Sequence, residues 1–172
     1  PKVLGEKAFQ TMPEIIQVLF KPHNKELTNK DLERKIYETR RKIENEAFKK
    51  SLNNFYICSL SSKSIIYKGM FLAEAISEFY LDLNDERFVS RYAIFHQRFS
   101  TNTAPSWNLA QPFRAIAHNG EINTYRGNKN WMKVHEQEMN SPLFDDIENL
   151  KPVIQQGLSL IHISEPTRPI HI

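Results

Sequence analysis

Apolar positions at helical spacing predict one long helix in the first third of the chain. Its start is marked by Thr28, with Asp31 three residues later, which is a variant of the capping box. Apolar residues then recur on roughly one face, at Leu32, Ile36, Ile43 and Ala47. The same spacing predicts shorter helices in residues 11–21, 72–80 and 129–139, the last capped by Asn128 and presenting Trp131, Met132 and His135 on one face.

Apolar residues that alternate with polar ones predict strands in the middle of the chain. Residues 55–60 and 64–68 flank a short polar turn and are expected to form a hairpin. Residues 88–99 are expected to form a central strand, with His96 as a hydrogen-bonded core histidine. Strands in the middle with helices before and after them predict an α+β fold.

The composition is that of one globular domain. The 172 residues are 40% hydrophobic and include 11 Phe, 6 Tyr and 2 Trp. The net charge of +3 comes from mixed acidic and basic residues, so nucleic acid is not an expected partner; the basic residues 40–42 are expected on a solvated face balanced by glutamates. No apolar run is long enough to span a membrane, and no signal peptide is recognisable.

The sole cysteine, Cys58, lies among apolar and aromatic neighbours and is expected to be a buried structural thiol. A single cysteine also fits a reducing compartment, so a cytoplasmic location is expected. The chain begins at Pro1 rather than at a methionine, and we therefore expect it to be a piece of a longer protein.

Candidate chemistry is concentrated between residues 94 and 124, where an apolar stretch turns into a run rich in Ser, Thr and Asn. Arg98 offers a planar fork for a carboxylate. Asn119 and Gly120 offer a side-chain NH2 and a backbone N–H to a developing oxyanion. Taken alone, Asn-Gly between apolar runs indicates a hairpin turn, so the functional interpretation depends on the wider pattern.

That wider pattern is similar to the class II glutamine amidotransferase domain and, within this family, to the large chains of glutamate synthases. The similarity lies in HQRFSTNT, PSW, LAQPFR, HNGEINT and GNKNWM, which occupy residues 96–103, 105–107, 109–114, 118–124 and 127–132. The resemblance implies an N-terminal-nucleophile hydrolase type αββα sandwich, here incomplete. It assigns residues 1–157 to a partial amidotransferase domain and residues 158–172 to a tail outside the family, similar to translated sequencing-adapter read-through.

The resemblance also implies roles for individual residues in the hydrolysis of L-glutamine. Asn119 and Gly120 correspond to the oxyanion hole and Arg98 to the anchor of the α-carboxylate, while Thr101 and Gln111 line the pocket. Two parts of the family site have no counterpart here. The nucleophilic cysteine is expected before Pro1, and the acidic residue that holds the α-ammonium is due where residues 158–162 stand. The isolated chain is therefore expected to be inactive.

In the whole enzyme, the resemblance implies that ammonia from glutamine passes to 2-oxoglutarate for reductive synthesis of glutamate. FMN and an iron–sulfur cluster are expected in later domains, with no cofactor or metal in this chain. The expected partners are the remaining synthase domains and a small electron-transfer subunit or ferredoxin; NADPH, NADH and ferredoxin stay open as donors. Two alternatives are another class II amidotransferase, such as a sugar or phosphoribosyl one, and a non-catalytic module that binds glutamine.

Overall fold

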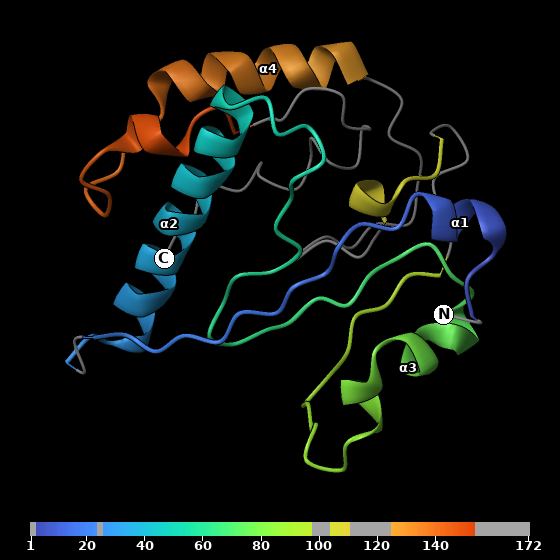
Figure 1. The fold of residues 1–172 in the computed structure, drawn as a ribbon. Coiled ribbons are helices and arrows are strands. Elements are labelled where there is room, and N and C mark those ends of the chain that lie inside the picture. Colours follow the sequence, from blue (N-terminus) through green and yellow to red (C-terminus); the bar gives the residue numbers. More distant parts are fainter. Residues whose placement is uncertain (1–2, 24–25, 98–103, 111–124, 154–172) are drawn as a thin grey trace. The chain divides into compact units, whose positions relative to one another are not determined.

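The computed structural model describes residues 3–23, 26–97, 104–110 and 125–153 (Figure 1). The chain divides into two compact units. The first unit comprises Pro1–Glu33 and Asn54–Pro112, and the second comprises Arg34–Asn53 and Phe113–Ile172. The α-helices are α1 (Glu6–Gln10), α2 (Asn29–Lys49), α3 (Ile76–Phe79) and α4 (Tyr125–Glu138). Short 3-10 helices are η1 (Ala73–Ala75), η2 (Leu81–Asn84), η3 (Trp107–Leu109) and η4 (Ile147–Leu150).

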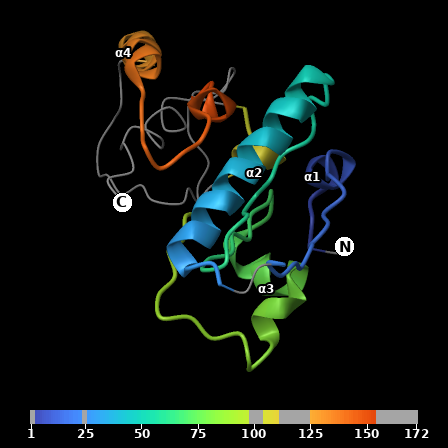
Figure 2. The ribbon, with the colours of Figure 1, turned by 90° about the vertical axis from the view of Figure 1, so that its left-hand side faces the viewer.

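Helix α2 confirms the long helix expected from the sequence, and it runs on without a break in Figure 2. The Thr28 hydroxyl oxygen accepts the Asp31 backbone N–H at 3.2 Å and donates to the Asp31 carboxylate. At the other end, Ser51 takes up a left-handed φ of 57°. The Ser51 and Leu52 N–H groups donate to the carbonyls of Phe48 and Ala47, which is the Schellman pattern. Local signals therefore fix both ends of this helix.

The expected helix in residues 11–21 is wrong, because α1 lies before it and ends at Gln10. The Thr11 hydroxyl donates to the carbonyls of Lys7 and Ala8 and so occupies the last turn of α1. Pro13 disfavours a helical conformation at the residue before it, which prevents α1 from continuing. The apolar residues that follow are left exposed, Leu19 to 89%.

The helices expected around residues 72–80 and 129–139 are present with changed bounds. The first consists of η1 followed directly by α3. The second, α4, begins four residues earlier than expected, so Asn128 lies inside the helix and does not cap it. Met132 is buried as expected of an apolar face, but the adjoining Trp131 is 77% exposed. His135 is exposed as well, so these three side chains do not share one buried face.

The expected strands are not found among the residues that the structure describes. Residues 55–60 and 64–68 do not form a ladder; instead, the Ile66 N–H donates to the hydroxyl oxygen of Ser59 at 3.2 Å. Residues 88–97 are irregular and exposed throughout, so His96 does not lie in a core. A strand exists only when a neighbouring strand satisfies its backbone groups, and alternation in the sequence does not supply that neighbour. Residues 98–99 of the expected central strand lie outside the described ranges.

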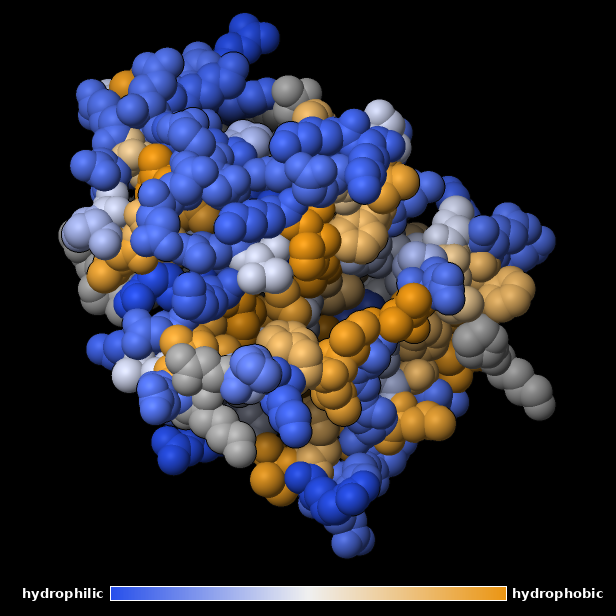
Figure 3. All heavy atoms as spheres, turned by 60° about the vertical axis from the view of Figure 1, so that its left-hand side comes forward, coloured by the Kyte–Doolittle hydropathy of each residue, from blue (hydrophilic) through white to orange (hydrophobic). Residues whose placement is uncertain are grey.

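The first unit is held by a cluster of aromatic rings rather than by a sheet. The Trp107 ring lies 5.8 Å from Phe79 and 6.4 Å from Phe71, centroid to centroid. Phe79 continues the cluster to Tyr80 at 4.9 Å, and Tyr80 continues it to Tyr67 at 4.7 Å. These contacts gather apolar area from η3, α3 and the segment before η1. Other apolar side chains stay at the surface, and one face on which they show is drawn in Figure 3.

Candidate functional site

All five residues predicted for the glutamine site lie outside the described residues. Arg98 and Thr101 fall in residues 98–103, and Gln111, Asn119 and Gly120 fall in residues 111–124. Their roles therefore stay predictions. The structure does describe two segments that adjoin them in the sequence. Residues 104–110 link the two undescribed stretches, and α4 begins directly after the second one.

The linking segment, residues 104–110, is anchored in the first unit by Trp107. Its side chain is only 4% exposed, and its indole N–H donates to the carbonyl of Ala8 at 3.0 Å. The Lys68 ammonium donates to the carbonyl of Asn108 at 2.7 Å, which gives the segment a second attachment. Residues 104–110 are thus fixed by one buried side chain and one backbone carbonyl.

A glycine makes room for the anchor. A Cβ atom added at Gly69 would lie 2.7 Å from Cζ3 of Trp107 and would also collide with the ring of Phe71. Real Cβ atoms essentially never approach other atoms so closely. The close approach of the indole to the backbone therefore depends on the missing side chain at this position.

Cys58 lies half-buried beside two tyrosines, and it forms no disulfide. Burial, and after it the proximity of Cys58, raises the pKa of Tyr80 to about 12. Burial and the same thiol also raise the pKa of Tyr56 far above its ordinary value. Both phenols therefore keep their protons at neutral pH and cannot act as a base toward the thiol. Neither phenol can therefore activate Cys58, which agrees with a structural thiol, although one less buried than the sequence suggested.

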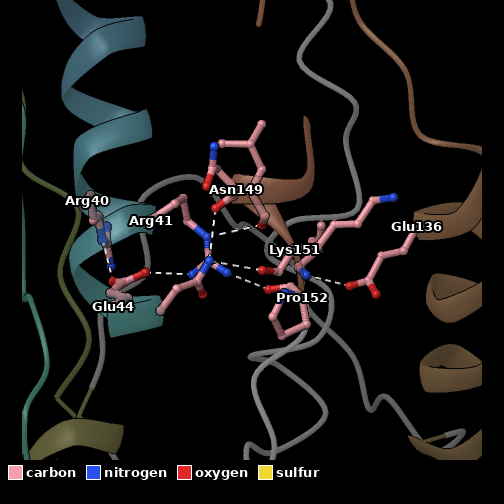
Figure 4. A network of polar contacts seen from close by, with 10 residues as sticks. Arg40, Arg41, Glu44, Glu136, Asn149, Lys151 and Pro152 are labelled. Atoms are coloured by element: carbon pink, nitrogen blue, oxygen red, sulfur yellow. Dashed lines mark hydrogen bonds and ion pairs between the residues drawn. The ribbon is translucent and has the colours of Figure 1, made fainter. Parts of the chain in front are cut away.

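In the second unit, side chains of α2 bind the main chain around η4 (Figure 4). Arg41 donates from Nε to the carbonyl of Leu150 at 3.2 Å and from Nη2 to the carbonyl of Pro152. One turn along α2, Asn45 donates from Nδ2 to the carbonyls of Asn149 and Lys151 at 2.9 and 3.1 Å. Two side chains thus bind four consecutive carbonyls in alternation. We call this set of contacts the carbonyl clamp.

Glu44 neutralises the charge at the centre of the carbonyl clamp. Its carboxylate accepts from Nη1 of Arg41 at 2.6 Å and from Nε of Arg40 at 2.7 Å. Arg41 is only 7% exposed, so the solvated basic face expected for residues 40–42 is wrong for this residue. Lys42 is exposed as expected. Nothing in the local pattern distinguishes Arg41 from its neighbours, because its carbonyl partners lie 109 and 111 residues away.

Helix α4 holds the end of the clamped segment. The carboxylate of Glu136 accepts the backbone N–H of Val153, and Val153 packs against the buried Met132 one turn earlier in α4. The peptide groups from Asn149 to Val153 are therefore held by side chains of two helices. These contacts connect α2 and α4 through one short stretch of main chain.

Two acidic residues after α3, Asp82 and Asp85, contact other side chains. Asp82 accepts the Tyr67 hydroxyl at 2.8 Å, and Asp85 forms an ion pair with Arg87 at 2.6 Å. Both carboxylates border an open groove of about 390 Å³. In the described ranges, no three His, Cys, Asp or Glu side chains are grouped so that they could hold a metal ion. Nor is any helix in those ranges both long and apolar enough to cross a membrane.

Comparison with known proteins identifies the family. The model of the class-II glutamine amidotransferases matches residues 1–162. The chain belongs to the class-II glutamine amidotransferases. The family resemblance seen in the sequence is therefore confirmed.

Relatives of this amidotransferase chain are glutamate synthases. It is 56% identical over 158 residues to the glutamate synthase [NADPH] large chain of Azospirillum brasilense, covering 91% of this chain and 10% of that protein. It is 47% identical over 148 residues to the chloroplastic ferredoxin-dependent glutamate synthase of Spinacia oleracea, covering 86% and 9%. It is 43% identical over 152 residues to the glutamate synthase [NADPH] large chain of Bacillus subtilis, covering 88% of this chain and 10% of that protein. The chain thus spans about a tenth of the length of these relatives.

Proposed function

We propose that the chain is the glutamine-binding part of the glutaminase domain of a glutamate synthase. The observation that carries the proposal is the 56% identity to a glutamate synthase large chain over 91% of this chain. Family membership alone would also admit other amidotransferases. High identity to synthases that use either NADPH or ferredoxin favours the synthase instead.

The proposed reaction begins when a thiolate adds to the amide carbon of glutamine. The carbonyl oxygen becomes an oxyanion, which the Asn119 amide and the Gly120 N–H stabilise. The C–N bond then breaks, ammonia leaves with a proton, and water hydrolyses the thioester to glutamate and the free thiol. Arg98 holds the α-carboxylate, and Thr101 and Gln111 line the pocket. The thiol is that of an N-terminal cysteine, as in the family resemblance, and not that of Cys58.

The finer features of fold and organisation are part of the same proposal. The family membership supports an N-terminal-nucleophile hydrolase fold with two packed sheets between helical layers, of which this chain supplies a part. Residues 1–157 belong to that domain and residues 158–172 form a tail outside it. A cytoplasmic location is proposed on the single cysteine, while plant relatives are chloroplastic by name.

The remaining partners and cofactors belong to the longer protein. Ammonia passes to 2-oxoglutarate in later synthase domains, where FMN and an iron–sulfur cluster are bound. The names of the relatives include both NADPH and ferredoxin, so an electron-transfer subunit or ferredoxin is the proposed electron-donating partner. Nucleic acid and membranes have no place in this function.

The test is a comparison of two substitutions in the full-length protein. Asn119→Ala should lower the glutaminase kcat about 100-fold or more with little change in KM, as the loss of one oxyanion donor does. Arg98→Ala should mainly raise the KM for glutamine, because the bidentate partner of the carboxylate is lost. Asn130→Ala and Arg126→Ala are matched controls, since both residues are exposed in α4.

Two results would overturn this proposal. If Asn119→Ala lost binding and Arg98→Ala lost turnover, the assigned roles would be reversed. If the full-length protein bound glutamine saturably without hydrolysing it, the chain would be a non-catalytic binding module.

A further inference from the structure

The apolar stretch that follows α1, residues 15–20, stays largely uncovered by the residues that the structure describes. Five of its six residues are apolar, and their exposed fractions run from 46% for Ile15 to 89% for Leu19. Soluble proteins rarely leave contiguous apolar side chains in water, and a patch of this kind marks an interaction site. The stretch is therefore expected to have a partner.

The backbone of the stretch also lacks partners within the described ranges. Residues 14–21 form no helix or strand (Figure 1), and no hydrogen bond joins their backbone groups to other backbone groups there. Water satisfies such groups while they are exposed, but a cover of apolar side chains would remove that water. A cover therefore has to supply hydrogen-bond partners as well as apolar area.

The local sequence is suited to a strand. Ile15, Ile16 and Val18 are β-branched, and such residues favour strands. Pro13 and Pro22 bound the stretch and leave eight residues between them, which is within the usual length of a strand. Both prolines lack an N–H, so a ladder is expected to end at them. What the stretch lacks is a neighbouring strand.

The stretch borders an open groove of the first unit. Gln17, its one polar residue, lines this groove of about 390 Å³ together with Ile65 and Phe88. Ile65 and Phe88 are themselves 43% and 41% exposed. The groove therefore offers further apolar area next to the stretch.

We propose that residues 15–20 become a strand by pairing with the segment of the longer protein that comes before Pro1. This inference rests on the proposed function, which places the nucleophilic cysteine on such a segment. The chain spans about a tenth of the length of its relatives, which leaves ample polypeptide for the pairing. Helix α1 begins at Glu6 in the first unit, so residues that precede Pro1 arrive beside this unit. The carbonyl of Ala8 in α1 accepts the indole N–H of the buried Trp107, which fixes the point of arrival.

A tethered segment is favoured over a second copy of the chain. A short flexible linker holds a segment at an effective concentration of about 1 mM, far above that of a protein free in solution. An added strand also meets both needs of the stretch, because its backbone completes a ladder and its side chains cover the apolar ones. A small ligand supplies no such row of backbone partners.

Hydrogen exchange of the unmodified full-length protein tests the pairing. Alternate amides within residues 15–20, those that face the added strand, should exchange about 100-fold or more slowly than in an unstructured peptide of the same sequence, because a ladder amide exchanges only when it opens. Mass spectrometry with residue-level fragmentation measures these rates. Exchange at the rate of the unstructured peptide throughout the stretch would overturn the inference.

Photo-crosslinking in the full-length protein identifies the occupant. p-Benzoylphenylalanine in place of Leu19 should crosslink to residues before Pro1 of the same polypeptide, and peptide mapping locates the crosslink. A second variant carries the group at Ile16, so the test survives if one variant does not fold. The matched control carries it at Leu81, which is 70% exposed in η2 of the same unit and should not crosslink to that segment.

Three crosslinking results at both positions of the stretch would overturn the inference: a crosslink to a second copy, a crosslink to residues after Ile172, or no crosslink. None of these readouts depends on turnover. The proposed function fails instead if the unmodified full-length protein does not hydrolyse glutamine, so the two failures are distinguishable.

Discussion

The two units of this chain fix irregular main chain by different interactions, apolar burial in the first and hydrogen bonds in the second. In the first unit, Trp107 fixes residues 104–110 by burying a large ring among other rings, with one hydrogen bond to Ala8. In the second unit, Arg41 and Asn45 fix residues 149–152 through carbonyl oxygens alone. Apolar burial is non-directional and tolerates small shifts, whereas hydrogen bonds to successive carbonyls specify a register. Both arrangements contribute to stability, and the second also specifies a register.

The largest expected effect is that of removing the aromatic anchor. Trp107→Ala should lower the free energy of unfolding by about 4 kcal/mol, because a buried indole is replaced by a cavity. Urea denaturation followed by far-UV circular dichroism measures it, since the indole signal itself is lost. Trp131→Ala is the control, because Trp131 is 77% exposed and should cost less than about 0.5 kcal/mol. Equal effects of the two substitutions would contradict the role given to the aromatic cluster.

Removing Arg41 should lower the free energy of unfolding by somewhat less. Arg41→Ala leaves the carboxylate of Glu44 without one of its two arginines and deprives two carbonyls of their donor. Breaking a buried ion pair from one side costs about 3 kcal/mol. The matched variant is Lys42→Ala, which changes an exposed cation on the next residue and should be nearly neutral. If both variants had the same urea midpoint, the carbonyl clamp would not contribute to stability.

A smaller effect should appear at high pH in the first unit. Burial raises the pKa of Tyr80 from its ordinary value of 10 to about 12, so the folded state keeps a proton that the unfolded chain loses. The contribution to the free energy of unfolding is complete below pH 10 and is lost as pH rises to about 12. In a Trp131→Phe background, Trp107 fluorescence reports urea unfolding of this unit. Tyr80→Phe should flatten the decline between these pH values, and an unchanged slope would contradict the assignment.

The smallest effect, a gain, is expected at the end of α2. Ser51 has a φ of 57°, where a side chain is disfavoured and glycine is at ease. Ser51→Gly should therefore raise the free energy of unfolding by about 0.5 kcal/mol, the relief of strain being partly offset by the freer unfolded chain. Ser61→Gly, at a position without a left-handed φ, should not stabilise the chain. A loss of stability in Ser51→Gly would show that the serine side chain contributes more than its backbone costs.

The sequence predicted those elements that depend on contacts between residues close together in the chain, and it failed where the partner is distant. Helix α2 was predictable because Thr28 and Asp31 cap it within three residues. The helix expected in residues 11–21 failed, although its apolar spacing was good, because Thr11 and Pro13 end α1 just before it. Strands were expected from alternation alone, and alternation does not provide the neighbouring strand on which a ladder depends.

The candidate site divides in the same way. The family was predictable from contiguous motifs such as HNGEINT, and the comparisons confirm the family. The positions of Arg98 and Asn119 lie outside the described residues and stay predictions. Arg41 could not be recognised in advance, because its spacing resembles that of a solvated helix face and its partners are more than a hundred residues away.

The carbonyl clamp also has a consequence for which positions of the chain tolerate substitution. Within residues 149–152, Arg41 and Asn45 contact only backbone carbonyl oxygens, which every amino acid carries, so these contacts do not depend on which side chains the segment has. We expect Asn149 and Lys151 to accept many replacements without loss of these contacts, whereas few side chains could replace the guanidinium of Arg41. The contact therefore restricts which residues α2 can carry at positions 41 and 45. Residues 149–152 can change in sequence while their backbone keeps the same path.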